Sequence, residues 1–281
     1  MPQIGDHLKS SRGLYSHHGL YVGSERVVHY SGLSDGLKSG PIEEVNLKKF
    51  CDDKGFEVIP HADRKHSRAE SVKRARSRLG EKAYSVTGNN CEHFVNWCID
   101  GEHTSGQVDD GMVMAYSSLS ASTGIASRAA VASVGSVFGL SGSGIMSGLA
   151  TVGSVVGGGA IAGIGVLGGS GGIAAASLIN GTVLKDDETL CSKERDSRSV
   201  GRKATYAGAA AGTAGSIAAV SAAGSVAGLS GAGITSGLAA IGGTVGGGMA
   251  AGVALTTAAP VAAAAAVGYG LYKAVKWLSR G

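Results

Sequence analysis

The chain has 281 residues, 48 of them glycine, and 16% of its residues are charged, with a formal net charge of +4 at pH 7. Glycine does not recur at every third position, which excludes a collagen-like triple helix. Four cysteines in this length exclude a disulfide-stabilised scaffold. The basic excess is too small and too scattered for a nucleic-acid-binding protein defined by its charge.

The composition changes along the chain, close to residue 128. Residues 1–128 hold 16 Lys and Arg, 16 Asp and Glu and all eight histidines, whereas residues 129–281 hold 34 of the glycines. The first part is therefore formally neutral, and the second carries the whole net charge. We expect a globular domain over residues 1–115, a Ser/Gly/Ala-rich linker over 116–128 and a separate region over 129–281.

The pattern of residues 1–115 is typical of a mixed α+β domain. Two β-favouring runs flank Gly23-Ser24-Glu25 and predict a hairpin. Ser67, with Glu70 three residues later, predicts the start of a helix, and Asn89 or Asn90 can cap a second one. The expected elements are strands over 20–22, 26–30 and 56–59 and helices over 67–79 and 91–99.

The glycine-rich region contains an internal repeat with an offset of 89 residues. A constant offset indicates a duplication and a structured segment rather than a random linker. The matching segments are 135–142 and 224–231, 147–150 and 236–239, and the triple glycines 157–159 and 246–248.

The two copies are free of charged residues over 129–184 and 204–272, with a charged loop expected over 185–203. Because a spanning helix needs about 20 apolar residues, each copy could hold two. Glycines four apart, such as 135 and 139, allow close helix packing in lipid. We expect two glycine-packed helical hairpins that associate with a membrane and could self-associate. The alternative is a soluble or disordered low-complexity tail.

Several features bear on the compartment. The basic residues of the 185–203 loop and of the C-terminus favour a cytoplasmic location for the first domain, the loop and the C-terminus. Residues 1–6 show no basic region followed by an apolar run, so no cleavable signal peptide is expected. Cys91 and Cys98 would lie two helical turns apart, too far for a disulfide. Free thiols in a reducing compartment are the simpler interpretation.

The reactive residue types of the first domain could form a nucleophilic site. Cys91 would begin a helix, where unpaired amide groups and the helix dipole favour a thiolate. His17 and His29 would lie near each other on adjacent strands. A cysteine, an imidazole base and a second polar group that orients the base suit acyl transfer. From spacing alone, structural histidines, a core cysteine and a zinc site with Cys91 and His93 stay open.

The segments 15–23 (YSHHGLYVG), 27–30 (VVHY) and 90–96 (NCEHFVN) resemble the lecithin retinol acyltransferase-like family. That family includes the H-rev107-type phospholipases/acyltransferases within the NlpC/P60 papain-like superfamily. Gly5-Asp6 and Tyr84 also resemble its pattern, and the resemblance covers about residues 2–101. It implies a circularly permuted papain-like α+β fold for this domain, followed by the Gly/Ala-rich all-α membrane-associated region.

The resemblance also implies roles for individual residues. Cys91 would be the nucleophile that forms a thioester acyl-enzyme, His17 the base, and His29 the residue that orients His17. Tyr15 would lie beside the active site and could help to hold the oxyanion. His18 stands where vertebrate relatives commonly carry an aromatic residue and would be a neighbour of the site. His93 belongs to the motif and would be structural.

The leading hypothesis is a membrane-associated thiol acyltransferase or phospholipase A-type acyl hydrolase that acts on lipid esters. No cofactor and no metal are expected, and the partners would be phospholipid or another acyl ester and the membrane, without nucleic acid. The first alternative is a cysteine peptidase or amidase of the NlpC/P60 type. The second is a membrane-inserting or toxin-like protein whose glycine-rich region is the effector.

Overall fold

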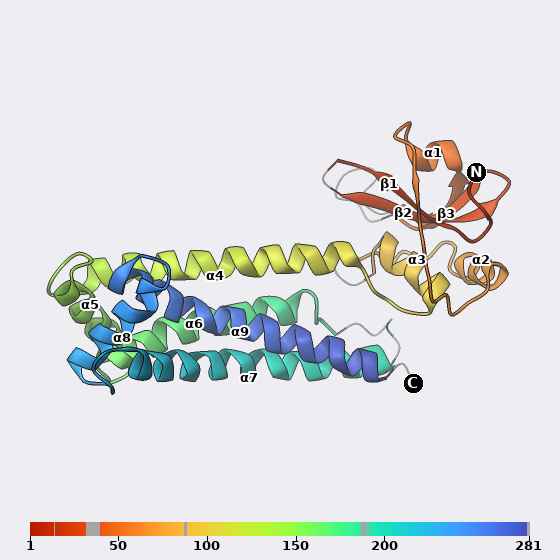
Figure 1. The fold of residues 1–281 in the computed structure, drawn as a ribbon. Coiled ribbons are helices and arrows are strands. Elements are labelled where there is room, and N and C mark those ends of the chain that lie inside the picture. The colour runs from red at the N-terminus through yellow and green to blue at the C-terminus, as the bar shows by residue number, and fades with distance from the viewer. Residues whose placement is uncertain (14, 32–39, 87–88, 187–189, 191, 280–281) are drawn as a thin grey trace. The chain divides into compact units, whose positions relative to one another are not determined.

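The computed structural model describes residues 1–13, 15–31, 40–86, 89–186, 190 and 192–279 (Figure 1). The chain divides into two compact units, Met1–Met112 and Val113–Gly281. The first unit is α+β and the second is helical, which agrees with the mixed composition of the sequence. The expected loop residues 187–189 and 191 and the basic residue at 280 lie outside the described residues.

The first unit is built on an antiparallel sheet in the order β4-β3-β2-β1-β5. The strands predicted from the sequence are present, with β2 longer than expected, and the sheet also contains β1 and β4. Its strands are β1 (His7–Ser11), β2 (Ser16–Gly23), β3 (Arg26–Tyr30), β4 (Ile42–Asn46) and β5 (Glu57–Ile59).

The β2–β3 hairpin turns at Ser24 and Glu25, whose φ angles are 49° and 56°. Two consecutive residues with positive φ match the right-handed twist of the flanking strands. The turn sets a register in which Gly19 pairs with His29 and Leu20 pairs with Val28. Because side chains alternate along a strand, this register decides which face each histidine takes.

The two faces of the sheet carry separate cores. On one face, Leu20, Val28 and Tyr30 pack against α2 (Arg68–Ser77) and α3 (Cys91–Asp100). On the other face, Val27 packs with Phe50 of α1 (Leu47–Cys51). Both predicted helices of this unit are therefore present, and they cover the same face.

The second unit consists of six helices within the described residues (Figure 1). They are α4 (Gly106–Val134), which begins in the first unit, α5 (Gly142–Ser154), α6 (Ala160–Gly181), α7 (Ser192–Ala223), α8 (Gly231–Gly243) and α9 (Gly248–Leu278).

The structure differs from the sequence-based expectation in two segments. The expected linker 116–128 lies within the continuous helix α4, because Ser and Ala are compatible with a helix and no proline interrupts it. Most of the expected charged loop, residues 192–203, forms the first three turns of α7. There Glu194 pairs with Arg198 one turn later (3.1 Å) and with Lys276 of α9 (2.8 Å), so the charges stabilise a helix pair.

The two copies of the repeat have the same local geometry. Ser141 and Ser230 cap α5 and α8, each accepting a hydrogen bond of 3.1 Å from a backbone amide. Close approach explains two of the glycines: a Cβ at Gly148 would collide with the Val131 carbonyl, and one at Gly237 with the Val220 carbonyl. Short helices therefore pack tightly against the long helices that precede them.

Each repeat holds one long apolar helix rather than two. Among the described residues, α6 and α9 are long and apolar enough to cross a membrane, with mean hydropathies of 1.6 and 1.7. The helices α5 and α8 have 13 residues each, or about 20 Å of helix, which is short of the hydrocarbon thickness of about 30 Å. Each uncharged block therefore holds one helix with the length and hydropathy of a span, where the sequence suggested two.

Candidate active site

Cys91 is the first residue of α3, and Asn90 holds the start of this helix. The Asn90 side chain accepts hydrogen bonds from the backbone amides of Glu92 and His93, both at 3.0 Å. His93 Nδ1 in turn accepts the Asn90 backbone N–H at 3.4 Å, completing a reciprocal cap. The cap fixes the direction in which Cys91 leaves the helix, and it gives His93 the structural role that the motif implies.

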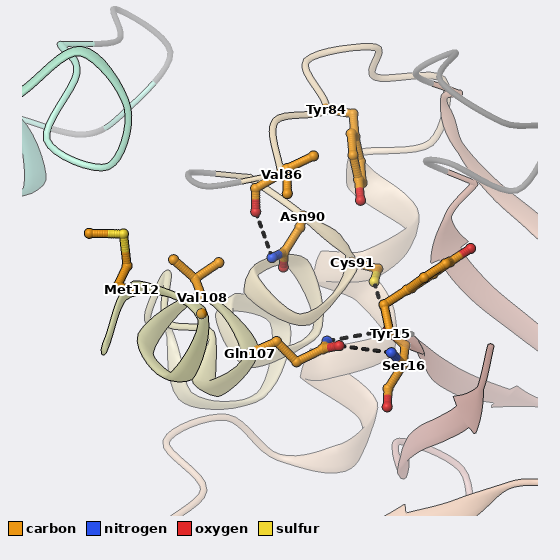
Figure 2. A pocket seen from close by; sticks show the side chains of 10 residues that line it. Tyr15, Ser16, Tyr84, Val86, Asn90, Cys91, Gln107, Val108 and Met112 are labelled. Carbon is orange, nitrogen blue, oxygen red and sulfur yellow. Dashed lines mark hydrogen bonds between the residues drawn. The ribbon is translucent and has the colours of Figure 1, made fainter. Parts of the chain in front are cut away.

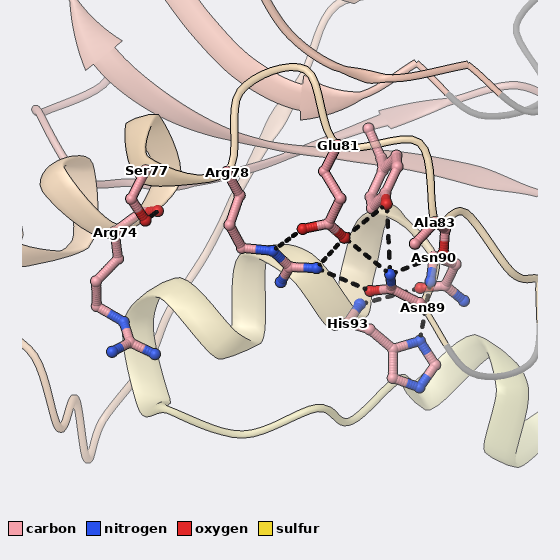
Figure 3. Close-up of polar contacts among 9 residues, drawn as sticks. Arg74, Ser77, Arg78, Glu81, Ala83, Asn89, Asn90 and His93 are labelled. Atoms are coloured by element: carbon pink, nitrogen blue, oxygen red, sulfur yellow. Dashed lines mark hydrogen bonds and ion pairs between the residues drawn. The ribbon is translucent and has the colours of Figure 1, made fainter. Parts of the chain in front are cut away.

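The segment before Asn90 is anchored by a partly buried polar network (Figure 3). Glu81 accepts hydrogen bonds from Arg78 Nε (2.7 Å), the Tyr30 hydroxyl (2.9 Å) and Asn89 Nδ2 (3.2 Å). Burial alone would raise the pKa of Glu81, but the hydrogen bonds and charge of Arg78 outweigh it and lower this pKa to about 2. An ionised carboxylate therefore ties α2, β3 and the start of α3 together.

A cavity of about 360 Å³ opens at the start of α3, with Cys91 in its wall (Figure 2). The Cys91 sulfur lies 3.9 Å from the Ser16 carbonyl, which accepts the thiol hydrogen. Most of the lining side chains are apolar or aromatic. The lining residues are Tyr15, Ser16, Tyr84, Val86, Asn90, Cys91, Gln107, Val108, Gly111 and Met112.

Two tyrosines line the cavity in different orientations (Figure 2). The Tyr84 hydroxyl points toward Cys91, whereas the Tyr15 hydroxyl points away from it. Burial raises the pKa of Tyr84, and a negative charge on Cys91 would raise it further, so its hydroxyl stays a donor. Tyr84 is thus closer to the orientation that the sequence analysis expected of Tyr15.

His17 and His29 form a buried imidazole pair on the face of β2 that is opposite to α3. His17 Nε2 and His29 Nδ1 are 2.8 Å apart, and both rings pack against Phe50, with centroids 5.2 and 5.7 Å away. Burial, and then the neighbouring His29, lowers the pKa of His17. Glu43 Oε1 lies 3.6 Å from His29 Nε2, beyond hydrogen-bonding distance.

Cys91 lies against the backbone of β2 on both sides of His17. Its sulfur contacts the Ser16 carbonyl and accepts from the His18 amide. Within the described residues, no hydrogen bond joins the sulfur to the His17 ring. The rings of His17 and His29 lie on the sheet face that packs on Phe50, whereas Cys91 belongs to the core on the opposite face. Among the described contacts, the two histidines are thus brought together, but neither ring is placed against the thiol.

The expectation that the helix start makes Cys91 a thiolate is not met. Burial raises the pKa of Cys91 to about 11, and the backbone amides that point at the sulfur only partly offset it. At neutral pH the resting group is therefore a thiol, and a base is needed to take its proton during reaction.

His18 points to the other face of β2, the face that α3 covers. Its Nδ1 lies 2.7 Å from His7 Nε2, and its Nε2 lies 3.1 Å from the Gln107 amide nitrogen. Sequence reasoning did not single out His7 or Gln107. Strand β1 was not predicted, and Gln107 follows a Ser/Gly-rich stretch with no motif, so the sequence holds no local signal for either.

The zinc alternative finds no support in the part of the chain that the structure describes. No group of three or more His, Cys, Asp or Glu side chains there is placed to share a metal ion. His93, the second residue of that alternative, faces the backbone of Asn90 instead.

Comparison with known proteins gives a consistent relationship. Residues 1–104 match the family model described as lecithin retinol acyltransferase. Human phospholipase A and acyltransferase 2 is 31% identical over 123 residues, 38% of this chain and 76% of that protein. Human phospholipase A and acyltransferase 3 is 28% identical over 130 residues, 41% of this chain and 80% of that protein.

Rat lecithin retinol acyltransferase is 29% identical over 134 residues, 37% of this chain and 57% of that protein. The chain thus spans little more than half the length of that relative. The residues matched by the family model, 1–104, include Cys91, His17 and His29. The resemblance noted in the sequence is confirmed: the chain belongs to the lecithin retinol acyltransferase family.

Proposed function

We propose that the first unit is a cysteine-dependent acyltransferase or phospholipase A-type acyl hydrolase that acts on lipid esters. Family membership supports an enzyme of the acyltransferase and phospholipase type. The observation that carries the finer assignment is the position of Cys91: it begins a capped helix, lines a largely apolar cavity and has its sulfur against the β2 backbone at Ser16 and His18, the two neighbours of His17. An apolar wall suits an acyl chain better than a peptide.

The first half-reaction transfers the acyl group to sulfur. The His17 imidazole takes the thiol proton as the Cys91 sulfur attacks the ester carbonyl carbon. The Tyr30 carbonyl, which can only accept, lies 3.2 Å from His29 Nδ1, so a neutral His29 carries its one ring hydrogen on Nδ1 and His17 Nε2, 2.8 Å away, accepts it. His17 Nε2 is then the unprotonated nitrogen, and it must leave this hydrogen bond and turn toward the sulfur to take the proton. The carbon–oxygen bond then breaks, and the alcohol leaves with the proton from His17.

The second half-reaction releases the acyl group. Water, or another hydroxyl or amine, attacks the thioester carbonyl and gives its proton to the His17 imidazole. The carbon–sulfur bond breaks, and the proton returns to the Cys91 sulfur. The oxyanion of each step would be held by the backbone amides at the start of α3, with the Tyr84 hydroxyl as a further donor and Tyr15 at the cavity rim.

The order of these residues supports a circularly permuted papain-like fold. In papain-type enzymes the cysteine precedes the histidine in the chain. Here His17 and His29 precede Cys91. The helix that begins with the cysteine packs against the sheet that carries the histidines, so a permuted chain can still assemble the same neighbours.

The test compares Cys91→Ala and Cys91→Ser with Cys98→Ala, a change of the same type in the buried core of the same helix. The full chain is incubated with phosphatidylcholine vesicles, and fatty acid release and the intact mass of the protein are measured. Wild type and Cys98→Ala should release fatty acid and carry one acyl adduct on Cys91. Release by Cys91→Ala above one tenth of the wild-type rate contradicts the proposal.

The second unit would bring this site to its substrate by associating with a membrane. Its polar groups gather at one end, where Lys276 pairs with Glu194 (2.8 Å) and Arg202 donates to the Leu184 carbonyl (2.8 Å). The opposite end consists of uncharged turns that expose Phe138 and Val155, which are 76% and 81% accessible. Exposed apolar tips and a charged far end suit insertion from one side.

The direction of the helices supports an even number of crossings. The helices α6 and α9 both run from the uncharged turns to the polar end. Each of these parallel spans needs a preceding segment that runs toward the uncharged turns: α4, antiparallel to α6, can supply one and the uncharged part of α7 beyond residue 203 the other, which makes four crossings. The polar end and the first unit would then face the cytoplasm, and the glycine-rich faces left over could serve self-association.

Protease protection in sealed vesicles tests this topology. With the polar end outside, trypsin should cut at Lys193 or Arg195, and a cysteine introduced at Phe138 should resist a membrane-impermeant maleimide. Labelling of the residue-138 cysteine as fast as that of a cysteine at Ser199 in the polar end would contradict insertion.

A further inference from the structure

Three histidines and a carboxylate form a continuous hydrogen-bonded array on the sheet face opposite to His17. His18 Nδ1 lies 2.7 Å from His7 Nε2, and His7 Nδ1 lies 2.8 Å from His61 Nε2. His61 Nδ1 lies 2.6 Å from Asp100 Oδ2. His7 and His18 are buried, and only Asp100 reaches solvent appreciably. The proposed reaction uses none of these four side chains.

Gln107 fixes the direction of the array at its inner end. The Ser16 backbone N–H, which can only donate, lies 2.8 Å from Gln107 Oε1, and the Ser16 carbonyl, which can only accept, lies 3.2 Å from Gln107 Nε2. The amide orientation of Gln107 is therefore set by the backbone. Its Nε2 then donates to His18 Nε2 at 3.1 Å, and that nitrogen must be unprotonated.

The remaining protons follow in order. His18 carries its hydrogen on Nδ1 and donates it to His7, His7 donates from Nδ1 to His61, and His61 donates from Nδ1 to the Asp100 carboxylate. The donor at the Gln107 end and the acceptor at the Asp100 end both require that each ring donates its hydrogen toward Asp100. All three rings are thus satisfied as neutral imidazoles with the same tautomer.

The array connects to the nucleophile through a single residue. The Ser16 carbonyl that accepts from Gln107 Nε2 is also the acceptor of the Cys91 thiol, at 3.9 Å. Gln107 lines the same cavity as Cys91 (Figure 2). A chain of hydrogen bonds therefore runs from Asp100 at the surface to the sulfur.

We propose that His18, His7 and His61, with Asp100, form a positioning array that holds the Gln107 amide against Ser16 and so sets the position of the Cys91 thiol. The inference rests on the proposed function only where its test measures lipid hydrolysis. His18 and Gln107 act through Ser16 and touch no reacting atom, so they are positioning residues.

Burial keeps the two inner rings, His7 and His18, neutral at physiological pH. Burial lowers the pKa of His18 to about 4, with Glu92 raising it and Lys9 lowering it to smaller extents. Burial, and then His18, His61 and Lys9, lowers the pKa of His7. Protonation of His18 would place a hydrogen on Nε2 against the Gln107 N–H, so acid should release Gln107 from its position.

Nuclear magnetic resonance of the full chain in detergent micelles, labelled with ¹⁵N-histidine, reads the tautomers directly. At pH 7, His7, His18 and His61 should each be neutral and protonated at Nδ1. Gln107→Glu replaces the donor by a carboxylate, so both ends of the array, residue 107 and Asp100, become acceptors. The three rings then need one additional hydrogen to donate at both ends, and one ring should become an imidazolium. Gln3→Glu, the same change at an exposed residue, should leave all three rings unchanged. An Nε2–H tautomer in the wild-type array overturns the proposal.

A matched pair at His7 tests the positioning role. The His7→Gln amide can still accept from His18 and donate to His61, whereas His7→Leu can do neither. The rate at which iodoacetamide alkylates Cys91 should change at least fivefold in His7→Leu and less than twofold in His7→Gln, each relative to wild type. The kcat for phospholipid hydrolysis should fall at least tenfold in His7→Leu, with KM nearly unchanged.

The outcomes separate the two proposals. Equal effects of His7→Leu and His7→Gln in a folded chain would reduce the array to core packing and overturn the inference. If the wild type does not hydrolyse lipid but the tautomers and the alkylation rates follow the expected pattern, the proposed function fails and the positioning array stands.

Discussion

Asn90→Ala tests whether the cap of α3 holds the nucleophile in place. The Asn90 side chain accepts two backbone amides at 3.0 Å and donates to the Val86 carbonyl at 2.9 Å. Loss of a helix cap costs about 1 kcal/mol. Leaving the buried amide of His93 and the Val86 carbonyl without partners adds about 1–3 kcal/mol. The expected loss is therefore about 2–4 kcal/mol in the free energy of unfolding of the first unit.

The assay is urea unfolding of the full chain followed by indole fluorescence. The sequence has two tryptophans, and Trp277→Phe leaves Trp97 of α3 as the reporter. Ser67→Ala is the matched control, because the exposed Ser67 caps α2 through one hydrogen bond of 3.2 Å and should cost about 1 kcal/mol or less. If Asn90→Ala loses no more stability than Ser67→Ala, the polar network around α3 does not hold the site as argued.

Three further changes probe other parts of the molecule. The folded-state pKa of Glu81 is depressed to about 2. Its contribution to the free energy of unfolding is therefore present above the unfolded pKa of about 4.3 and is lost as the pH falls toward 2. Glu81→Gln should cost about 1–2 kcal/mol at pH 7 after allowance for solvent screening, and should flatten the loss of stability between pH 4 and pH 2 in urea unfolding. Alkylation of Cys91 by iodoacetamide, followed by peptide mass spectrometry, should keep accelerating up to pH 10 and beyond, and a plateau near pH 8 would contradict the raised pKa. In α7, Gly215→Ala adds a Cβ in open space and should raise the thermal midpoint slightly, whereas Gly208→Ala presses a Cβ against the Ala263 carbonyl and should lower it.

Local signals in the sequence were sufficient for the elements around the nucleophile. Asn90 and Ser67 are capping residues, and they define where α3 and α2 begin. Gly23-Ser24-Glu25 locates the hairpin turn that brings His17 and His29 together. Each of these features depends on a few neighbouring residues, which a single sequence displays directly.

The features that could not be predicted depend on distant partners. Helix α7 begins within the charged stretch because Glu194 meets Lys276, which lies 82 residues later in the chain (276 − 194). The pKa of Cys91 is raised because the folded unit buries the thiol, and burial outweighs the favourable position at a helix start. Likewise, the contacts of His7 depend on the pairing of β1 with β2, for which the sequence holds no local signal.

The alternation of side chains along β2 gives two adjacent histidines different chemical surroundings. His17 faces Phe50 and His29, whereas His18 faces His7 and Gln107. Gly19 keeps this register, since a Cβ there would lie 2.7 Å from the Phe50 ring that packs on His17. A slip of one residue would exchange the two faces and break both sets of contacts. The two imidazoles therefore cannot replace each other, because each has partners that only its own face of the sheet supplies.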